Sequence, residues 1–165
     1  MLITPYGNEL VDRYVSVTEL DKALAKTRHL TIRINNDDLI NLANLAGGAY
    51  SPLTGFMTED QYLGVINDCK IHVGLDWTIP ILLHINDHNA EKLQNFEVVA
   101  LQDDTGNMVG MVEIGSIFRI NHSEYAEKIF STSDNAHPGV KVLDGKPTTC
   151  VGGPVSVVDG AIEPQ

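Results

Sequence analysis

The histidines His84 and His88 are the clearest candidates for chemistry, because they stand four residues apart with Asp87 between them. On a helix, this spacing would place both imidazole rings on one face, where they could bind one metal ion. The residues before His84 predict a strand, however, and two residues four apart on a strand lie about 13 Å from each other, which is too far for one ion. We therefore expect Asp87 to cap a short helix over residues 89–93, and we expect no metal site.

Another histidine, His137, follows Thr132 and Asp134 and precedes Pro138 and Gly139. A histidine beside a carboxylate can activate a nucleophile, but the two nearby serines lie in no nucleophile-elbow sequence. The alternative is a tight turn, in which the histidine caps backbone groups, the proline fixes φ and the glycine supplies a positive φ. We favour the turn and assign no catalytic residue.

Groups that would hold an anionic substrate are scattered along the sequence. Enzymes that act on multiply charged anions need convergent Arg, Lys or a metal ion. The sequence has no Gly-Lys-Ser/Thr phosphate loop, and none of its four arginines lies in a Gly-rich or His-rich loop. The residues alone therefore predict no active site and no cofactor. The four arginines are Arg13, Arg28, Arg33 and Arg119.

The length and the charge restrict the classes of function. A sequence of 165 residues is long enough for one domain with its own hydrophobic core. It carries 22 acidic and 11 basic residues, a formal net charge of −11 at pH 7. Nucleic-acid backbones and anionic membranes attract clustered Lys and Arg, so we expect neither as a partner. The sequence also lacks an apolar run of roughly 20 residues and a secretory signal, which predicts a cytoplasmic protein.

The two cysteines, Cys69 and Cys150, are too few for a disulfide framework. We expect reduced thiols, both of them buried, because cysteine is among the residue types most often buried. Thr58 and Gln61 form a capping box that opens a helix, and Tyr62 and Cys69 recur on its apolar face.

The pattern of elements predicts an α+β fold. Strands do not alternate regularly with long helices, which argues against a doubly wound parallel sheet. We expect a mixed, mainly antiparallel sheet or small barrel with three or four flanking helices. Helices are expected to begin at Ser16, at Asn36 or Asp37, at Thr58 and at Ser123, and strands to cover residues 30–34, 78–85, 97–102, 108–120 and 150–158.

Four segments occur in a characteristic order: GAYSPLTGFM at residues 48–57, GLDWTIPILL at 74–83, the run F-x-T-x-D-x-x-HPGV at 130–140, and VGGPV at 151–155. Together they resemble the N-terminal domain of ATP sulfurylase (sulfate adenylyltransferase). The resemblance covers residues 1–165 and implies a single PUA-like domain, a mixed β-barrel with flanking helices. One departure is a serine before the Thr of the third segment, where the family has glycine.

The resemblance implies a link to sulfate activation. The family joins ATP and sulfate to make adenosine 5′-phosphosulfate and pyrophosphate. Its catalytic motifs, Gln-x-Arg-Asn-Pro, His-x-x-His and Gly-Arg-Asp-His, lie in a second domain, and none of them occurs in this sequence. We therefore expect a non-catalytic domain without a cofactor. Its expected partners are the catalytic domain, in cis or in trans, and further copies in a homo-oligomer. The alternative is a free-standing PUA-like module that binds RNA or protein.

Two loops rich in Gly and Pro carry the candidate interface residues. A surface loop of this composition needs a reason to hold one shape. The first loop either fills the interior of its own domain or waits for a partner, and both alternatives remain open from the sequence. In the second case, both loops lie on one side and form a seat for the catalytic domain. The candidates are Pro52, Leu53, Gly55, Phe56, Met57, Thr132, Asp134, His137, Pro138 and Gly139.

Overall fold

The last strand, β10 (Thr149–Val158), joins the two parts of the fold. The structure is a computed structural model that describes residues 4–71 and 74–162. Within these residues, β10 forms five strand pairs, of which the pair with β1 is parallel and the others are antiparallel. Its partners are β1 (Tyr14–Val15), β3 (Gly55–Phe56), β6 (Leu83–Ile85), β8 (Met108–Glu113) and β9 (Ser116–Arg119).

The main sheet continues from β10 in the order β1-β10-β8-β7-β2. The pairing of β2 (His29–Arg33) with β7 (Val98–Gln102) is parallel, and that of β7 with β8 is antiparallel. The expected mixed, mainly antiparallel sheet is confirmed. The order has an end at β1 and another at β2, so the described strands form an open sheet and not a closed barrel. A separate small hairpin pairs β4 (Lys70–Ile71) with β5 (Leu75–Asp76).

Glycines allow β10 to pass very close to its neighbours. Gly153 has φ +151°, and a Cβ at this residue would collide with the carbonyl oxygen of Glu113. A Cβ at Gly55 would collide with the carbonyl oxygen of Gly153 in the same way. Only glycine tolerates both the unusual φ and the close approach of the backbones. The VGGPV segment is therefore the bend at which β10 changes partners.

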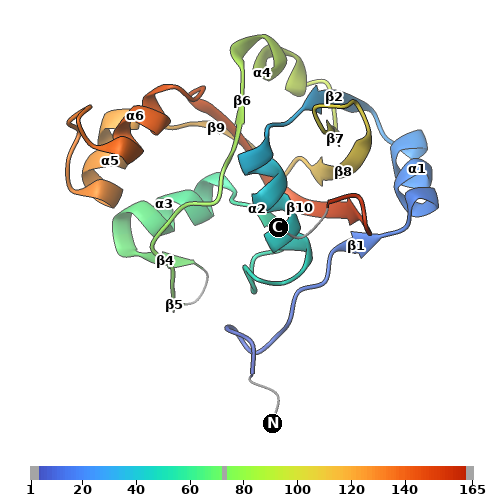
Figure 1. Cartoon of the computed structure of the whole chain (residues 1–165), viewed down its shortest axis with the longest axis horizontal. Helices are drawn as coiled ribbons and strands as arrows, with labels where there is room; N and C mark the ends of the chain where they lie inside the picture. The colour runs from blue at the N-terminus through green and yellow to red at the C-terminus, as the bar shows by residue number, and fades with distance from the viewer. Residues whose placement is uncertain (1–3, 72–73, 163–165) are drawn as a thin grey trace.

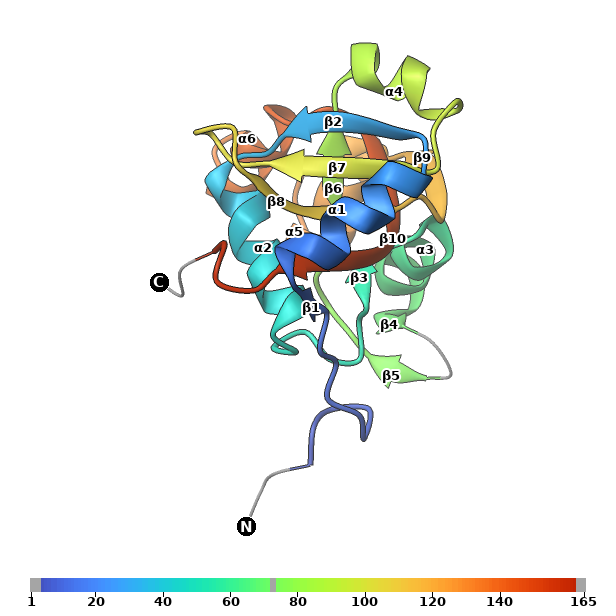
Figure 2. The same ribbon diagram turned by 90° about the vertical axis from the view of Figure 1, so that its right-hand side faces the viewer.

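Six helices surround the sheet in the described residues, more than the three or four expected. Side chains alternate across a strand, and in β7 both faces are covered. Val98 and Ala100 join a small apolar cluster with α1, which lies over β7 and β8 in Figure 2. Val99 and Leu101 join the main core on the other face. The helices are α1 (Val17–Lys26), α2 (Asn36–Ala46), α3 (Glu59–Asp68), α4 (Asp87–Leu93), α5 (His122–Phe130) and α6 (Pro138–Asp144).

The helices α5 and α6 contact each other and lie at the opposite end of the molecule from α1 (Figure 1). The helix α6 is a correction to the sequence analysis, which expected a loop there. Its seven residues are too few for an apolar period to be recognised. None of the helices in the two described ranges has both the length and the apolar character needed to span a membrane.

The capping residues show where local sequence signals succeed. The capping boxes at Ser16 and Thr58 are both present. Three other helices begin one or two residues earlier than expected, because an asparagine side chain accepts the N–H of the third residue after it. These N-caps are Asn35, Asn86 and Asn121, in place of the expected Asn36 or Asp37, Asp87 and Ser123.

The expectation of two buried thiols is right for Cys150 and wrong for Cys69. Cys69 ends α3 in the left-handed conformation, with φ +53°, so the residue leaves the helical periodicity. Its side chain is exposed, whereas Tyr62 and Val65 of the same helix are buried as expected. The apolar pattern was therefore extended one residue beyond the end of the helix.

Candidate functional site

The first candidate loop, residues 51–57, lies in the core of the domain. Leu53, Phe56 and Met57 are each at most 1% exposed and belong to the main apolar cluster. The backbone N–H of Met57 donates to the carbonyl of Ile81 (2.9 Å), and Gly55 and Phe56 pair with β10. Of the two alternatives that the sequence left open, the interior position holds for these three apolar side chains.

The second candidate loop, residues 130–140, lies at the surface and is held by its own side chains. Thr132 Oγ1 accepts the N–H of Asp134 (3.1 Å), and Asp134 Oδ1 accepts the N–H of Ala136 (2.8 Å). His137 is the N-cap of α6, because its Nδ1 accepts the N–H of Gly139 (3.2 Å). Three polar side chains of the loop thus each accept a backbone N–H, which explains its defined shape.

The capping role expected for His137 is confirmed, and Pro138 follows it at the first helical position. The role expected for Gly139 is wrong, because its φ is not positive. A Cβ at Gly139 would instead lie 2.8 Å from Cζ of Phe130. Phe130 also stacks on the His137 ring, with ring centroids 5.0 Å apart. Gly139 is therefore required for space beside this aromatic pair.

The histidines His84 and His88 point to different partners. His84 Nδ1 lies 2.7 Å from the carbonyl oxygen of Pro147, and His88 Nε2 lies 2.8 Å from Nζ of Lys92. The described residues contain no group of three or more His, Cys, Asp or Glu side chains arranged to hold a metal ion.

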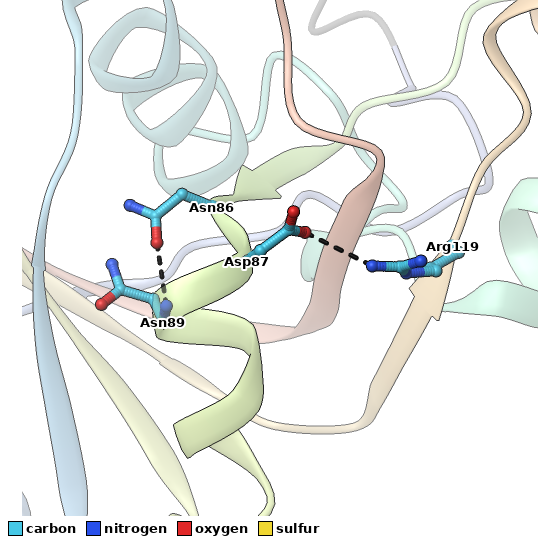
Figure 3. A network of polar contacts seen from close by, with 4 residues as sticks. All are labelled: Asn86, Asp87, Asn89 and Arg119. Atoms are coloured by element: carbon cyan, nitrogen blue, oxygen red, sulfur yellow. Dashed lines mark hydrogen bonds and ion pairs between the residues drawn. The ribbon is translucent and has the colours of Figure 1, made fainter.

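The residue between these histidines, Asp87, forms an exposed ion pair with Arg119 (3.4 Å), and Asn86 caps the helix by accepting the N–H of Asn89 (Figure 3). Because both partners of the ion pair are largely exposed to water, it stabilises the fold little.

A pocket of about 340 Å³ lies beside the second loop, between α2, α5, α6 and β6. We call it the α6 pocket. None of the residues 51–57 lines it, so the two candidate loops do not share this cavity. His84 and Lys146 could not be recognised as neighbours from the sequence, because they are far apart in the chain and only the fold brings them together. The principal lining residues of the α6 pocket are Leu82, His84, Phe130, Pro138, Val142 and Lys146.

Buried groups next to the pocket are kept in their neutral forms. Burial raises the pKa of the Cys150 thiol to about 12 and that of Tyr125 to about 12. Burial also lowers the pKa of His84, and the nearby Lys146 and His122 lower it further, while the hydrogen bond to Pro147 acts in the opposite direction. A neutral thiol and neutral phenols are weak nucleophiles, so this cluster does not form a catalytic centre by itself.

Comparison with known proteins places the fold in a family. Residues 3–160 match a family described as a PUA-like domain. The chain belongs to this PUA-like family. The resemblance to the N-terminal domain of ATP sulfurylase, noted from four short segments, is also confirmed by proteins that are similar over nearly the whole chain.

Three sulfate adenylyltransferases illustrate the similarity of this PUA-like chain to longer proteins. Those of Hyperthermus butylicus and Microcystis aeruginosa are 33% and 34% identical over 165 residues, which is 99% of this chain and 42% of each relative. That of Symbiobacterium thermophilum is 32% identical over 158 residues, 95% of this chain and 40% of the relative. The chain thus spans about two-fifths of the length of the relatives that it matches.

A solved structure supports the fold. A chain of a hexameric APS kinase from Thiobacillus denitrificans superposes with a TM-score of 0.70 and 24% sequence identity. The superposition covers 99% of the present chain and 28% of the other chain. At this level of identity the likeness concerns the fold alone. It agrees with the PUA-like assignment.

Proposed function

We propose that this chain is a non-catalytic PUA-like domain of a sulfate adenylyltransferase, residues 1–165 forming a single domain. In the complete enzyme it would support the catalytic domain that joins ATP and sulfate to give adenosine 5′-phosphosulfate and pyrophosphate. One observation carries the proposal: 99% of this chain aligns with only 42% of two sulfate adenylyltransferases. The remainder of those proteins is long enough for the reacting groups that this sequence lacks.

The polar side chains of the second loop support a structural role. Asp134 and His137 each accept a backbone N–H, and no hydrogen bond or ion pair joins their side chains among the described residues. No convergent group of arginines or lysines was found in the sequence, although ATP and sulfate are both anions. The domain therefore offers a scaffold and contact surfaces.

The exposed side of the second loop is the proposed contact with the catalytic domain, in cis or in trans. Residues 133–136 are exposed and held in one shape by short hydrogen bonds, as a docking loop requires. The first loop would act indirectly, since Leu53 and Phe56 fix the interior. Contacts between domains of one chain typically bury about 600–1,500 Å², so neighbouring surface must take part, and further copies of the chain are proposed partners as well.

We also propose a cytoplasmic location. Both cysteines are free, and free thiols persist in reducing compartments.

A domain exchange tests the proposal. The Microcystis aeruginosa relative would be shortened by the segment that aligns with this chain, and this chain would then be fused in its place. We expect sulfate-dependent pyrophosphate release from the chimera, and little from either part alone. A chimera that folds but releases no pyrophosphate, while the intact relative does so under the same conditions, would contradict the proposal.

A variant of the docking loop sharpens this test. His137→Asn keeps a side-chain acceptor for the N–H of Gly139 but removes the ring. We expect the melting temperature to stay nearly unchanged while association with the catalytic segment in trans weakens. Lys128→Gln, an exposed change near the end of α5, is the matched control and should alter neither quantity. If His137→Asn leaves association unchanged, the ring takes no part in the contact.

A further inference from the structure

The α6 pocket combines apolar walls with a few polar side chains, Asn41, His84 and Lys146. Leu82, Phe130, Val142 and Pro138 provide the walls, and Val142 remains 58% exposed. A volume of about 340 Å³ is at the small end of the range for small-molecule sites. The space suits one aromatic ring or branched aliphatic group.

His84 presents one unused ring nitrogen. Its Nδ1 lies 2.7 Å from the carbonyl oxygen of Pro147, so this nitrogen carries the proton and donates. The Nε2 atom is then the acceptor of the neutral ring, and no partner for it is found among the described residues. A ring whose one nitrogen is fixed by a carbonyl is held in orientation for a ligand at the other nitrogen.

Lys146 brings a positive charge without a paired carboxylate. The ion pairs within 4.0 Å among the described residues are Arg119–Asp87 and His122–Asp144, and neither includes Lys146. Asp38 of α2 lies close enough for attraction to Lys146 but does not line the pocket. The ammonium group is thus available at the edge of an apolar pocket.

None of the other groups described around His84 is an anion that would take the place of a bound carboxylate. His122 and Lys146 disfavour the charged ring, and Cys150, whose Sγ lies 3.7 Å from Nδ1, is a neutral thiol. Asn41 of α2 also lines the pocket, and its Oδ1 accepts a hydrogen bond from Tyr50 (3.2 Å), which leaves the amide nitrogen to donate. The polar edge of the pocket therefore offers donors from Lys146 and Asn41, in addition to the Nε2 atom of His84.

We propose that the α6 pocket binds a small amphipathic carboxylate, with its apolar group between Phe130 and Val142 and its anionic group between Lys146 and His84. On binding, His84 Nε2 takes up one proton from solvent and donates to the carboxylate. The ligand carries one negative charge and the site gains one positive charge. The inference concerns a site on this domain and does not rest on the proposed function.

The coupling to a proton follows from the surroundings of the ring. In the free protein, burial lowers the pKa of His84 below its ordinary value. A bound anion favours the charged ring and raises this pKa again. The affinity for the carboxylate therefore increases as the pH is lowered from values above the ordinary histidine pKa, which is about 6.5. Repulsion by the net charge of −11 is largely screened at physiological salt, with a Debye length of about 8 Å.

The probe for the experiment is phenylacetate, and the matched neutral probe is phenylacetamide. Titration of the whole chain would be followed by NMR, using the ring signals of His84 as a site-specific reading of protonation. We expect millimolar affinity for phenylacetate, at least about fivefold tighter at pH 5.5 than at pH 8, because only the protonated ring donates from Nε2. Phenylacetamide should bind about tenfold more weakly at the lower pH, since it lacks the charge.

Three variants and one control test the assignment of residues. Lys146→Met should weaken phenylacetate binding about tenfold. Lys141→Met, which changes an exposed residue of α6 outside the pocket, should change binding less than about twofold. His84→Asn keeps a donor near Pro147 and should abolish the pH dependence. Asp38→Asn should tighten binding, because it removes the charge that competes for Lys146.

Equal binding of both probes, equal effects of the two lysine variants, or a pH dependence that persists in His84→Asn would each overturn the proposal. Circular dichroism would show that each variant is folded.

Discussion

The two Gly- and Pro-rich loops have similar compositions and opposite positions in the molecule. Residues 51–57 are pinned to β10 by strand pairing and bury the side chains of Leu53, Phe56 and Met57 completely. Residues 130–140 remain at the surface and owe their shape to hydrogen bonds from Thr132, Asp134 and His137. Composition alone predicts that each loop has a defined shape, but it does not say whether the interior or the loop itself defines that shape.

The difference lies in the partner of the backbone. In the first loop, Gly55 faces the backbone of Gly153 across the bend of β10, and the Phe56 and Met57 side chains that follow it enter the core. In the second loop, no strand is available, so side chains bind the free N–H groups and the histidine starts a helix. The first loop should thus be sensitive to packing, and the second to changes in hydrogen bonding.

The largest effect is expected from Gly55→Ala. The added Cβ would collide with the Gly153 carbonyl, and a backbone contact of this kind cannot be relieved by a side-chain rotation. We expect a loss of more than about 4 kcal/mol of stability, measured by urea unfolding, or failure to fold. Gly145→Ala is the control: its nearest neighbour would be at 3.5 Å and its φ is −78°, so stability should change little.

The next effect compares two phenylalanines. Phe56→Ala should cost about 3–5 kcal/mol of unfolding free energy, as expected for a fully buried ring. Phe130→Ala should cost about 1–2 kcal/mol, because this ring is half-buried and part of its surface is exposed already. Urea unfolding of both variants gives the comparison. Equal losses would mean that the second loop is as much a part of the core as the first.

A smaller effect isolates the helix cap of the second loop. His137→Ala removes the acceptor for the N–H of Gly139 and should cost about 1 kcal/mol. His137→Asn should recover most of this loss, since asparagine is among the best N-capping residues. The melting temperature of the two variants measures the difference. If asparagine gives no recovery, the stacking on Phe130, not the cap, accounts for the loss.

The smallest effect is a pH dependence of stability around the α6 pocket, which borders the second loop. Because the pKa of His84 is lowered in the folded chain, the unfolded chain binds more protons just below pH 6.5. The contribution of His84 to stability is complete above about pH 6.5 and is lost as the pH falls towards the lowered pKa. The hydrogen-exchange protection factor of Val140, corrected for the slower intrinsic exchange at lower pH, should fall before those of Phe56 and Met57. His84→Asn should remove this difference between the two regions.

Features that depend on a few neighbouring residues were predictable from the sequence. The capping boxes at Ser16 and Thr58 and the buried face of α3 follow from local spacing. The capping role of His137 was expected from the proline after it, whereas the positive φ expected at Gly139 is not found. The first loop was recognised as ordered, but its burial depends on β10, about a hundred residues further along the chain.

Features that arise from distant contacts were not predictable. The left-handed end of α3 at Cys69 depends on one φ value, and the apolar pattern extends past it. The α6 pocket brings together His84 and Lys146, whose separation in the sequence gives no signal. The helix α6 is short, and its first residues were interpreted as a turn. For the pocket the missing information is a contact between distant residues, and for Cys69 and α6 it is a local backbone conformation that the apolar pattern does not show.

The position of β10 at the end of the chain has a consequence for synthesis. At about 5–20 residues per second, the stretch between β1 and β10 takes on the order of 10 s to be made. During this time β1, β3, β6, β8 and β9 lack their common partner, and only local pairs such as β7 with β8 can form. Unpaired strand edges invite aggregation. A nascent chain released before Thr149 is therefore a natural substrate for chaperones and proteases.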